Sequence, residues 1–203
     1  MTKIKLCGLT RLVEADYANE AAPDFTGFVF DAGRHFVTDD LAAAIRKRID
    51  PAIPAVGIFV REDQDHIVRL VESGVIQYVQ LHGGESEDYI RRLKEKISCP
   101  FIKVISVTTK EDVLKGAGTA AEYLLLDHGR GGTGQAFDWR EIPPIKKKWF
   151  MAGGIGMDNL EEALSFHPWA VDISSGAETD GVKDIHKMKA LVAMAHRERR
   201  RSK

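Results

Sequence analysis

The sequence has no long apolar run. No stretch of its 203 residues approaches the roughly 18 consecutive apolar residues that a membrane-spanning helix requires. The first residues, MTKIKLC, also lack the apolar core of a secretory signal. We therefore expect no association with membranes and a cytoplasmic location.

The sequence has few cysteines and a net charge close to zero. Cys7 and Cys99 are the only cysteines, too few for a disulfide framework. The 29 Lys and Arg residues balance 30 Asp and Glu residues, so the net charge of -1 gives no general attraction to nucleic acid. The basic residues at 196–203 are interpreted as a solvated helix end. A hydrophobic content of 44% excludes a disordered chain.

Several motifs of cofactor chemistry are also missing. No Gly-x-Gly-x-x-Gly follows the first apolar run and no Gly-Lys-Ser/Thr occurs, which disfavours nucleotide binding. His82 and His128 have no second ligand at close spacing, and His186 and His196 are ten residues apart, so we expect no metal. No cofactor is expected.

What the sequence does contain is a series of eight short apolar runs. Their residues suit strands that are buried on both faces, as in a parallel sheet. The runs are Ile4–Cys7, Thr26–Phe30, Ala55–Val60, Tyr78–Leu81, Phe101–Val107, Tyr123–Leu126, Trp149–Ala152 and Ala170–Ser174.

Between the runs lie segments with helical periodicity. They are Asp65–Gly74, Ser86–Ile97, Asp158–Leu164 and Asp184–Ala195, with weaker signals after Thr10 and Thr38 and a short helix expected after Asp127. The runs begin 21 to 29 residues apart, the length of a strand, a helix and two loops. We predict an α/β fold, a compact (β/α)8 barrel formed by residues 1–203 as one domain, with an open doubly wound sheet as the alternative.

In such a barrel the active site lies at the carboxyl ends of the strands. Cys7 ends the first strand and Asp127 the sixth, and a thiolate base with a carboxylic acid would form a pair for proton transfer. Both groups would need environmental help, because a free Cys has a pKa near 8.5 and a free Asp near 3.9. Alternatively, Cys7 is a small buried apolar residue, and Asp127 is a helix cap or a loop residue.

Glycines follow the last two strands. Gly153 and Gly154 follow the seventh strand, and Ser175 and Gly176 follow the eighth. Loops at these two positions commonly bind phosphate, because backbone N–H groups can approach the anion closely. The alternative is a pair of ordinary tight turns.

The motifs resemble those of the phosphoribosylanthranilate isomerase family of tryptophan biosynthesis. The resemblance covers residues 3 to about 190 and is carried by KLCGLT at 5–10, GFVF at 27–30, VGIFV at 56–60, VQLHG at 79–83, LLD at 125–127, GGTG at 131–134, FDW at 137–139, AGG at 152–154 and VDISSG at 171–176.

The resemblance implies a cofactor-free Amadori rearrangement of N-(5′-phosphoribosyl)anthranilate to 1-(2-carboxyphenylamino)-1-deoxyribulose 5-phosphate. Asp127 matches the acid that protonates the ring oxygen, and Cys7 matches the base that removes the C2′ proton. Gly153, Gly154, Ser175 and Gly176 match the phosphate site.

Two further residues match the family on the substrate side. His82 matches the histidine of the fourth-strand motif, and Gln80, two residues earlier, points the same way but lies deeper. Asp172 matches a family carboxylate, and one hypothesis is that like-charge repulsion from it raises the pKa of Asp127.

The chain departs from the family after the second strand. The family's arginine for the anthranilate carboxylate falls on His35, with Arg34 one residue earlier. We favour Arg34, because a guanidinium can bind a carboxylate through two parallel hydrogen bonds and an imidazole cannot.

Two other functions remain as rivals. A histidine-pathway aminoaldose isomerase would carry an aspartate in place of Cys7, and a non-catalytic binding barrel would not need both Cys7 and Asp127. The expected partner is a small phosphorylated substrate, and the chain is expected to be a monomer or a homodimer.

Overall fold

The computed structural model describes residues 2–127 and 139–201, and for residues 198–201 the backbone only. Within them, eight parallel strands form a closed barrel in sequence order. The strands are β1 (Lys3–Cys7), β2 (Phe25–Val29), β3 (Ala55–Phe59), β4 (Tyr78–Leu81), β5 (Phe101–Ser106), β6 (Tyr123–Asp127), β7 (Lys148–Ala152) and β8 (Ala170–Ile173). The (β/α)8 prediction is confirmed.

Pairing of the first strand with the last closes the barrel. Lys3 lies opposite Ala170 and Lys5 opposite Asp172 in a parallel register between β1 and β8. An open doubly wound sheet has no such seam, so that alternative is wrong. Each end of a predicted strand agrees with the observed one or differs from it by one residue.

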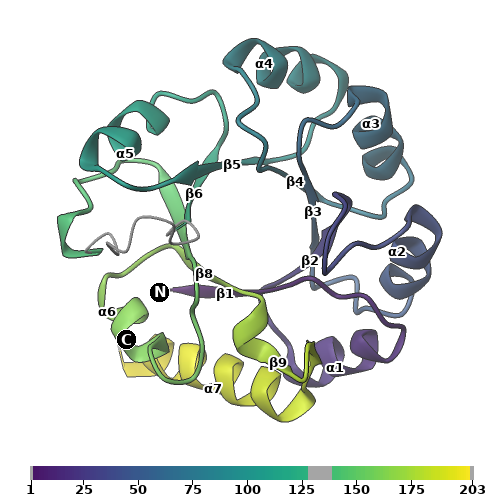
Figure 1. Ribbon diagram of the computed structural model, residues 1–203. Helices are drawn as coiled ribbons and strands as arrows, with labels where there is room; N and C mark the ends of the chain where they lie inside the picture. The colour runs from purple at the N-terminus through teal and green to yellow at the C-terminus, as the bar shows by residue number, and fades with distance from the viewer. Residues whose placement is uncertain (1, 128–138, 202–203) are drawn as a thin grey trace.

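Helices surround the barrel (Figure 1). They are α1 (Val13–Ala21), α2 (Asp39–Arg46), α3 (Gln64–Glu72), α4 (Glu87–Lys96), α5 (Lys110–Gly116), α6 (Leu160–Ser165) and α7 (Ile185–Arg201), with short 3-10 helices η1 (Trp139–Glu141) and η2 (Ser175–Ala177). A two-stranded ribbon of β9 (Glu178–Thr179) and β10 (Val182–Lys183) precedes α7. No helix in the part of the chain that the structure describes is long and apolar enough to cross a membrane.

Local signals explain where the helices begin and end. Ser86 precedes α4 as predicted, and its hydroxyl accepts a hydrogen bond from the backbone N–H of Tyr89 at 3.2 Å. Gly74 follows α3 with a φ of +73°, a conformation that glycine adopts without strain. α7 extends to Arg201, six residues beyond its predicted end.

α5 is a helix that the apolar periodicity does not predict. Its seven residues bury only Val113, so no periodic apolar face exists in the sequence. It begins instead with a capping box, in which Thr109 and Asp112 each bond to the backbone N–H of the other. The short helix expected after Asp127 falls on residues 128–138, outside the described residues.

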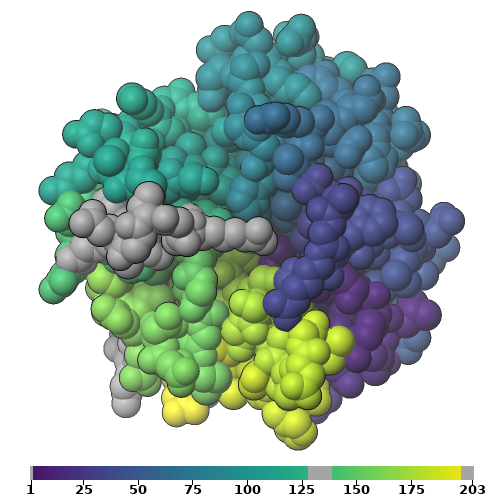
Figure 2. Space-filling view, viewed as in Figure 1, coloured from purple at the N-terminus to yellow at the C-terminus, as the bar shows by residue number. Residues whose placement is uncertain are grey.

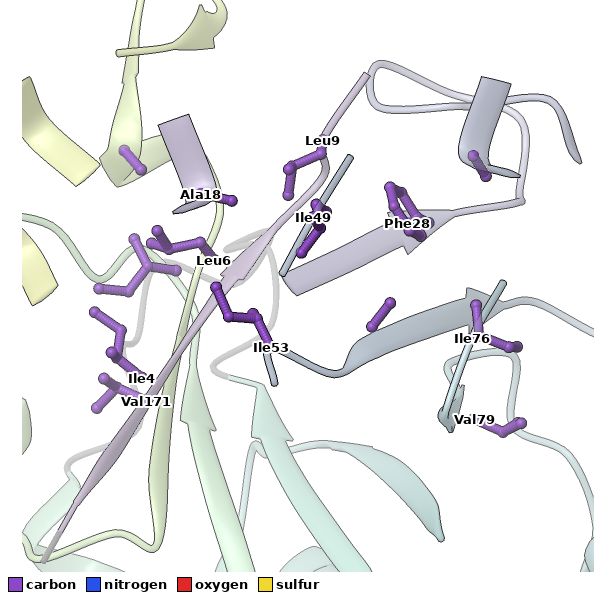
Figure 3. Close-up of a cluster of buried hydrophobic side chains, with 14 of the residues drawn as sticks. Ile4, Leu6, Leu9, Ala18, Phe28, Ile49, Ile53, Ile76, Val79 and Val171 are labelled. Atoms are coloured by element: carbon purple, nitrogen blue, oxygen red, sulfur yellow. The ribbon is translucent and has the colours of Figure 1, made fainter. Parts of the chain in front are cut away.

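The barrel has two separate apolar layers because side chains alternate along each strand. Outward-facing residues such as Ile4, Leu6 and Val171 pack under the helices, as Figure 3 shows. Inward-facing residues such as Phe25 and Leu125 form the inner cluster.

Aromatic rings fill the amino-terminal end of the barrel interior. Phe25, Tyr78, Tyr123, Phe150 and Trp169 contact one another, the closest pair being Tyr123 and Trp169 with ring centroids 4.6 Å apart. This end is therefore packed, and the polar inward-facing residues lie toward the opposite, carboxyl-terminal end.

The layer between strands and helices predicts a stability difference between two equivalent changes. Leu6→Ala removes a fully buried side chain and should cost about 2–5 kcal/mol of unfolding free energy. Leu114→Ala, at a side chain that is 57% exposed, should change it by no more than about 0.5 kcal/mol. Urea unfolding monitored by circular dichroism measures both, and equal losses would contradict this assignment of the core.

Candidate active site

The strand ends bring the proposed base and acid to the same end of the barrel. Cys7 is the last residue of β1 and Asp127 the last of β6. Cys7 packs with the inner cluster, and Asp127 lies two residues after the inward-facing Leu125, so its side chain faces inward too. Nε2 of His82, just beyond β4, lies 3.5 Å from Oδ2 of Asp127.

Cys7 fits because its neighbour on β2 is a glycine. Gly27 lies opposite Cys7 in the register, and a Cβ at Gly27 would stand 2.9 Å from Sγ of Cys7. A larger residue at position 27 would displace the thiol. The close approach of β2 thus fixes the place of Sγ.

A buried lysine lies below Cys7 on the same strand. Lys5 is fully buried, and its Nζ donates hydrogen bonds to Oδ2 of Asp172 at 2.8 Å and to Oε1 of Gln80 at 3.1 Å. The contact confirms that Gln80 points inward. A charged lysine is tolerated here only because the carboxylate of Asp172 compensates it.

The Lys5–Asp172 pair sets the electrostatics of Cys7. Burial raises the pKa of the Cys7 thiol, and the negative charge of Asp172 raises it further, whereas Lys5 and Lys183 oppose the rise. For Lys5, burial lowers the pKa, but Asp172 and Cys7 outweigh burial and raise it overall. The hypothesis that Asp172 acts on Asp127 stays a prediction.

One oxygen of Asp172 remains available. Oδ1 is buried and has no hydrogen-bond partner among the described residues, while Oδ2 is held by Lys5. A buried carboxylate oxygen without a partner is costly, and a substrate hydroxyl would satisfy it.

The glycine loops after β7 and β8 pack against each other. A Cβ on Gly176 would lie 2.1 Å from the carbonyl oxygen of Ile155, so only glycine fits. Gly153 and Gly154 have φ angles of +99° and +66°. Ser175 and Gly176 form the first turn of η2. These four residues therefore lie together at the carboxyl ends of β7 and β8, as the phosphate-site prediction requires.

The loop after β2 carries both candidates for the carboxylate-binding residue. Its base returns to the strand, where Val37 donates its N–H to the carbonyl of Val29 at 3.0 Å. Nη2 of Arg34 and Nε2 of His35 both contact Glu178, at 2.5 and 2.8 Å. In Figure 2 this purple-blue loop lies against the yellow-green segment that follows β8.

Sequence reasoning missed three charged residues of this region. Lys5, Glu178 and Lys183 are all buried, and each is part of an ion pair. Lys5 has a sequence signal, since it is a lysine two residues before Cys7 in an apolar strand. Glu178 and Lys183 have none, because a short ribbon between strand and helix leaves no periodicity.

A pocket borders His82 on the side of β5 and α5. It measures about 290 Å³, and its polar lining includes Lys103, Ser106 and Lys115. Lys103 is buried there and paired with Glu85 at 3.1 Å. Among residues 2–127 and 139–201, no three His, Cys, Asp or Glu side chains gather as a metal site would require; His128 lies outside them.

The geometry predicts that two substitutions shift the pKa of the Cys7 thiol in opposite directions. Lys5→Met removes a cation that lowers the Cys7 pKa and should raise that pKa, whereas Asp172→Asn should lower it. The rate of alkylation by iodoacetamide as a function of pH measures both pKa values. The background is Cys99→Ser, because Cys99 is a second thiol, and although burial raises its pKa to about 11, its alkylation at high pH would overlap with that of Cys7. Shifts in the same direction would contradict the arrangement.

Comparison with known proteins identifies the family of this chain from its sequence. The family model for N-(5'phosphoribosyl)anthranilate (PRA) isomerase matches residues 4–194. The N-(5'-phosphoribosyl)anthranilate isomerase of Endomicrobium trichonymphae is 42% identical over 193 residues, which are 93% of this chain and 95% of that protein.

Solved structures agree with the sequence match. The phosphoribosyl anthranilate isomerase of Thermus thermophilus superimposes with a TM-score of 0.85 at 31% identity, over 97% of this chain and all (100%) of that one. A phosphoribosyl anthranilate isomerase in complex with reduced 1-(o-carboxyphenylamino)-1-deoxyribulose 5-phosphate gives a TM-score of 0.80 at 27% identity, over 97% of this chain and 99% of that one. The chain therefore belongs to the N-(5'-phosphoribosyl)anthranilate isomerase family, whose members are isomerases of tryptophan biosynthesis.

Proposed function

We propose that this isomerase converts N-(5′-phosphoribosyl)anthranilate to 1-(2-carboxyphenylamino)-1-deoxyribulose 5-phosphate, with Cys7 as general base and Asp127 as general acid. The observation that carries the assignment is the shared position of the two groups, inward-facing at the carboxyl ends of β1 and β6. The glycine loops after β7 and β8 lie at the same end. Family membership supports the same reaction.

The first step opens the sugar ring. A protonated Asp127 donates its proton to the furanose ring oxygen while the C1′–O4′ bond breaks, and the nitrogen lone pair of the anthranilate forms the C1′=N bond. His82 lies 3.5 Å from Oδ2 of Asp127 and is placed to hold that carboxyl against the substrate. Acid and base act from different strands, so each can reach its own atom of one bound molecule.

The second step moves a proton from carbon. The thiolate of Cys7 removes the C2′ proton, and the electrons of that bond form C1′=C2′ while the C=N electrons return to nitrogen. The resulting enolamine gains a proton at C1′ and loses the O2′ proton, which yields the ketone. No external electron acceptor is needed, because the substrate nitrogen acts as the electron sink.

Substrate binding uses the remaining residues of the site. The phosphate binds at Gly153, Gly154, Ser175 and Gly176, where glycines allow close approach of backbone N–H groups. Oδ1 of Asp172, buried and without a partner in the described structure, accepts a hydrogen bond from a sugar hydroxyl.

Arg34 binds the anthranilate carboxylate in this proposal. Burial and the nearby charge of Lys183 lower the pKa of His35, which is therefore neutral at pH 7. A guanidinium is a permanent cation, and the Arg34 side chain is 57% exposed. A permanent cation that faces solvent suits an incoming carboxylate better than a neutral imidazole does.

Substitution of the two proton-transfer residues tests the chemistry. Cys7→Ser and Asp127→Asn should each lower kcat by about 10²- to 10⁴-fold, because each removes one proton-transfer group. The assay follows the loss of anthranilate fluorescence with freshly prepared substrate, and Cys99→Ser serves as the control with unchanged kcat. Wild-type protein that fails to turn over substrate, or either variant at full activity, would refute the proposal.

Substitution of the loop residues tests the binding assignment. Arg34→Ala should raise KM by about tenfold or more, because a charge-assisted contact with the carboxylate is lost. His35→Asn should change KM by less than about threefold, since it removes no charge at pH 7. A larger effect at His35 than at Arg34 would reverse the assignment.

A further inference from the structure

Glu178 is a buried carboxylate that joins three basic side chains. Its Oε2 accepts a hydrogen bond from Nη2 of Arg34 at 2.5 Å, and its Oε1 contacts Nε2 of His35 at 2.8 Å and Nζ of Lys183 at 2.6 Å. Glu178 and Lys183 are almost fully buried, whereas more than half of the Arg34 side chain is exposed. The cluster thus anchors an exposed cation to a buried anion.

The basic neighbours of Glu178 favour its ionised form. Burial alone raises the pKa of this carboxyl, but the hydrogen bond and charge of Lys183, with smaller contributions from His35 and Arg34, outweigh burial and lower the pKa. Lys183 also donates to the carbonyl oxygen of Ser174 at 3.1 Å, next to the glycine loop after β8. The same pair therefore contacts both the β2 loop and the proposed phosphate loop.

Two glycines let the β2 loop approach this anchor. Gly8 has a φ of +84°, and a Cβ there would stand 2.9 Å from Cγ of His35. Gly181, in the turn of the ribbon, has a φ of +82°, and a Cβ there would stand 3.3 Å from Nη2 of Arg34. Because neither glycine has a side chain, the loop lies directly on the residue that follows β1 and on the turn of the ribbon.

We propose that Glu178 is a positioning residue, which fixes the guanidinium of Arg34 at the barrel mouth so that it selects substrates that carry an anthranilate carboxylate. The inference rests on the proposed function of Arg34. Glu178 holds Arg34 through Nη2, and the exposed remainder of the side chain faces the solvent from which substrate arrives. A long arginine side chain that is already ordered loses less conformational freedom on binding, so it discriminates better.

Two ligands that differ only in the carboxylate isolate this effect. The first is the reduced product analogue, 1-(2-carboxyphenylamino)-1-deoxyribitol 5-phosphate, and the second is its phenylamino counterpart without the carboxylate. Isothermal titration gives the ratio of their Kd values for each variant. A role in general folding would change both Kd values, whereas a role through Arg34 changes the ratio.

The expected result is that the preference for the ligand with the carboxylate is lost while binding through the phosphate is kept. Glu178→Gln should reduce the Kd ratio by about tenfold while the Kd of the ligand without carboxylate stays within about twofold. In an Arg34→Ala background, the same substitution should leave the ratio unchanged, because the residue that it positions is gone.

Two further variants keep the test decisive. Glu178→Gln leaves Lys183 buried without its anion, so Glu178→Gln combined with Lys183→Met provides a charge-balanced version that should show the same loss of preference. Glu122→Gln is the matched control. Glu122 also pairs with a lysine, Lys94, and accepts a hydrogen bond from the backbone N–H of Phe101. Phe101 begins β5, so this control lies at the opposite end of the barrel.

The outcomes separate this inference from the proposed function. If Arg34→Ala abolishes the preference and both Glu178 variants retain it, the inference is overturned and the role of Arg34 stands. If wild-type protein shows no preference, or Arg34→Ala retains it, the assigned role of Arg34 fails and the inference fails with it. If Glu178→Gln reduces the ratio equally with and without Arg34, Glu178 does not act through Arg34.

Discussion

The ion pair between Lys5 and Asp172 spans the seam at which the barrel closes. The two residues are register partners on β1 and β8, and Nζ and Oδ2 lie 2.8 Å apart in the interior. Neither charge would be tolerated alone at this depth, so the pair is stable only while the two strands are in this register. The same register places Cys7, two residues beyond Lys5, at the barrel mouth, and the pair shapes the electrostatic environment of its thiol.

Buried opposite charges recur around the mouth. Lys183 with Glu178 and Lys103 with Glu85 are further buried pairs near the carboxyl ends of the strands, and each also bonds to backbone. The aromatic amino-terminal end contains no comparable pair among the described interior residues. Charge is thus concentrated at the end where a phosphate and a carboxylate of the substrate are proposed to bind, and it is fixed in place before either arrives.

The fold could be predicted from the sequence because each strand is buried on both faces. Apolar runs at regular spacing give the strand order, and the rule that barrel sites lie at strand ends then selects Cys7 and Asp127. α5 was not predicted, because a helix that buries only one residue has no apolar periodicity. Thr109 and Asp112 do carry a capping signal at its start. Helix ends were predicted best where a cap exists, as at Ser86.

The charged part of the site could not be predicted in the same way. Lys5 meets Asp172 across 167 residues of sequence, and Glu178 meets Arg34 across 144, so neither contact leaves a local pattern. The choice between Arg34 and His35 also depends on environment. Counting residues puts the family's arginine position on His35, whereas the lowered pKa of the half-buried His35 favours Arg34 as the residue with the positive charge.

A crystal structure with the reduced product analogue tests the central claim most directly. The account predicts the phosphate against Gly153, Gly154, Ser175 and Gly176, the C2′ carbon facing Sγ of Cys7, and the aromatic carboxylate on Arg34. A complex in which C2′ lies out of reach of Cys7, or in which the phosphate occupies a different pair of loops, would contradict it.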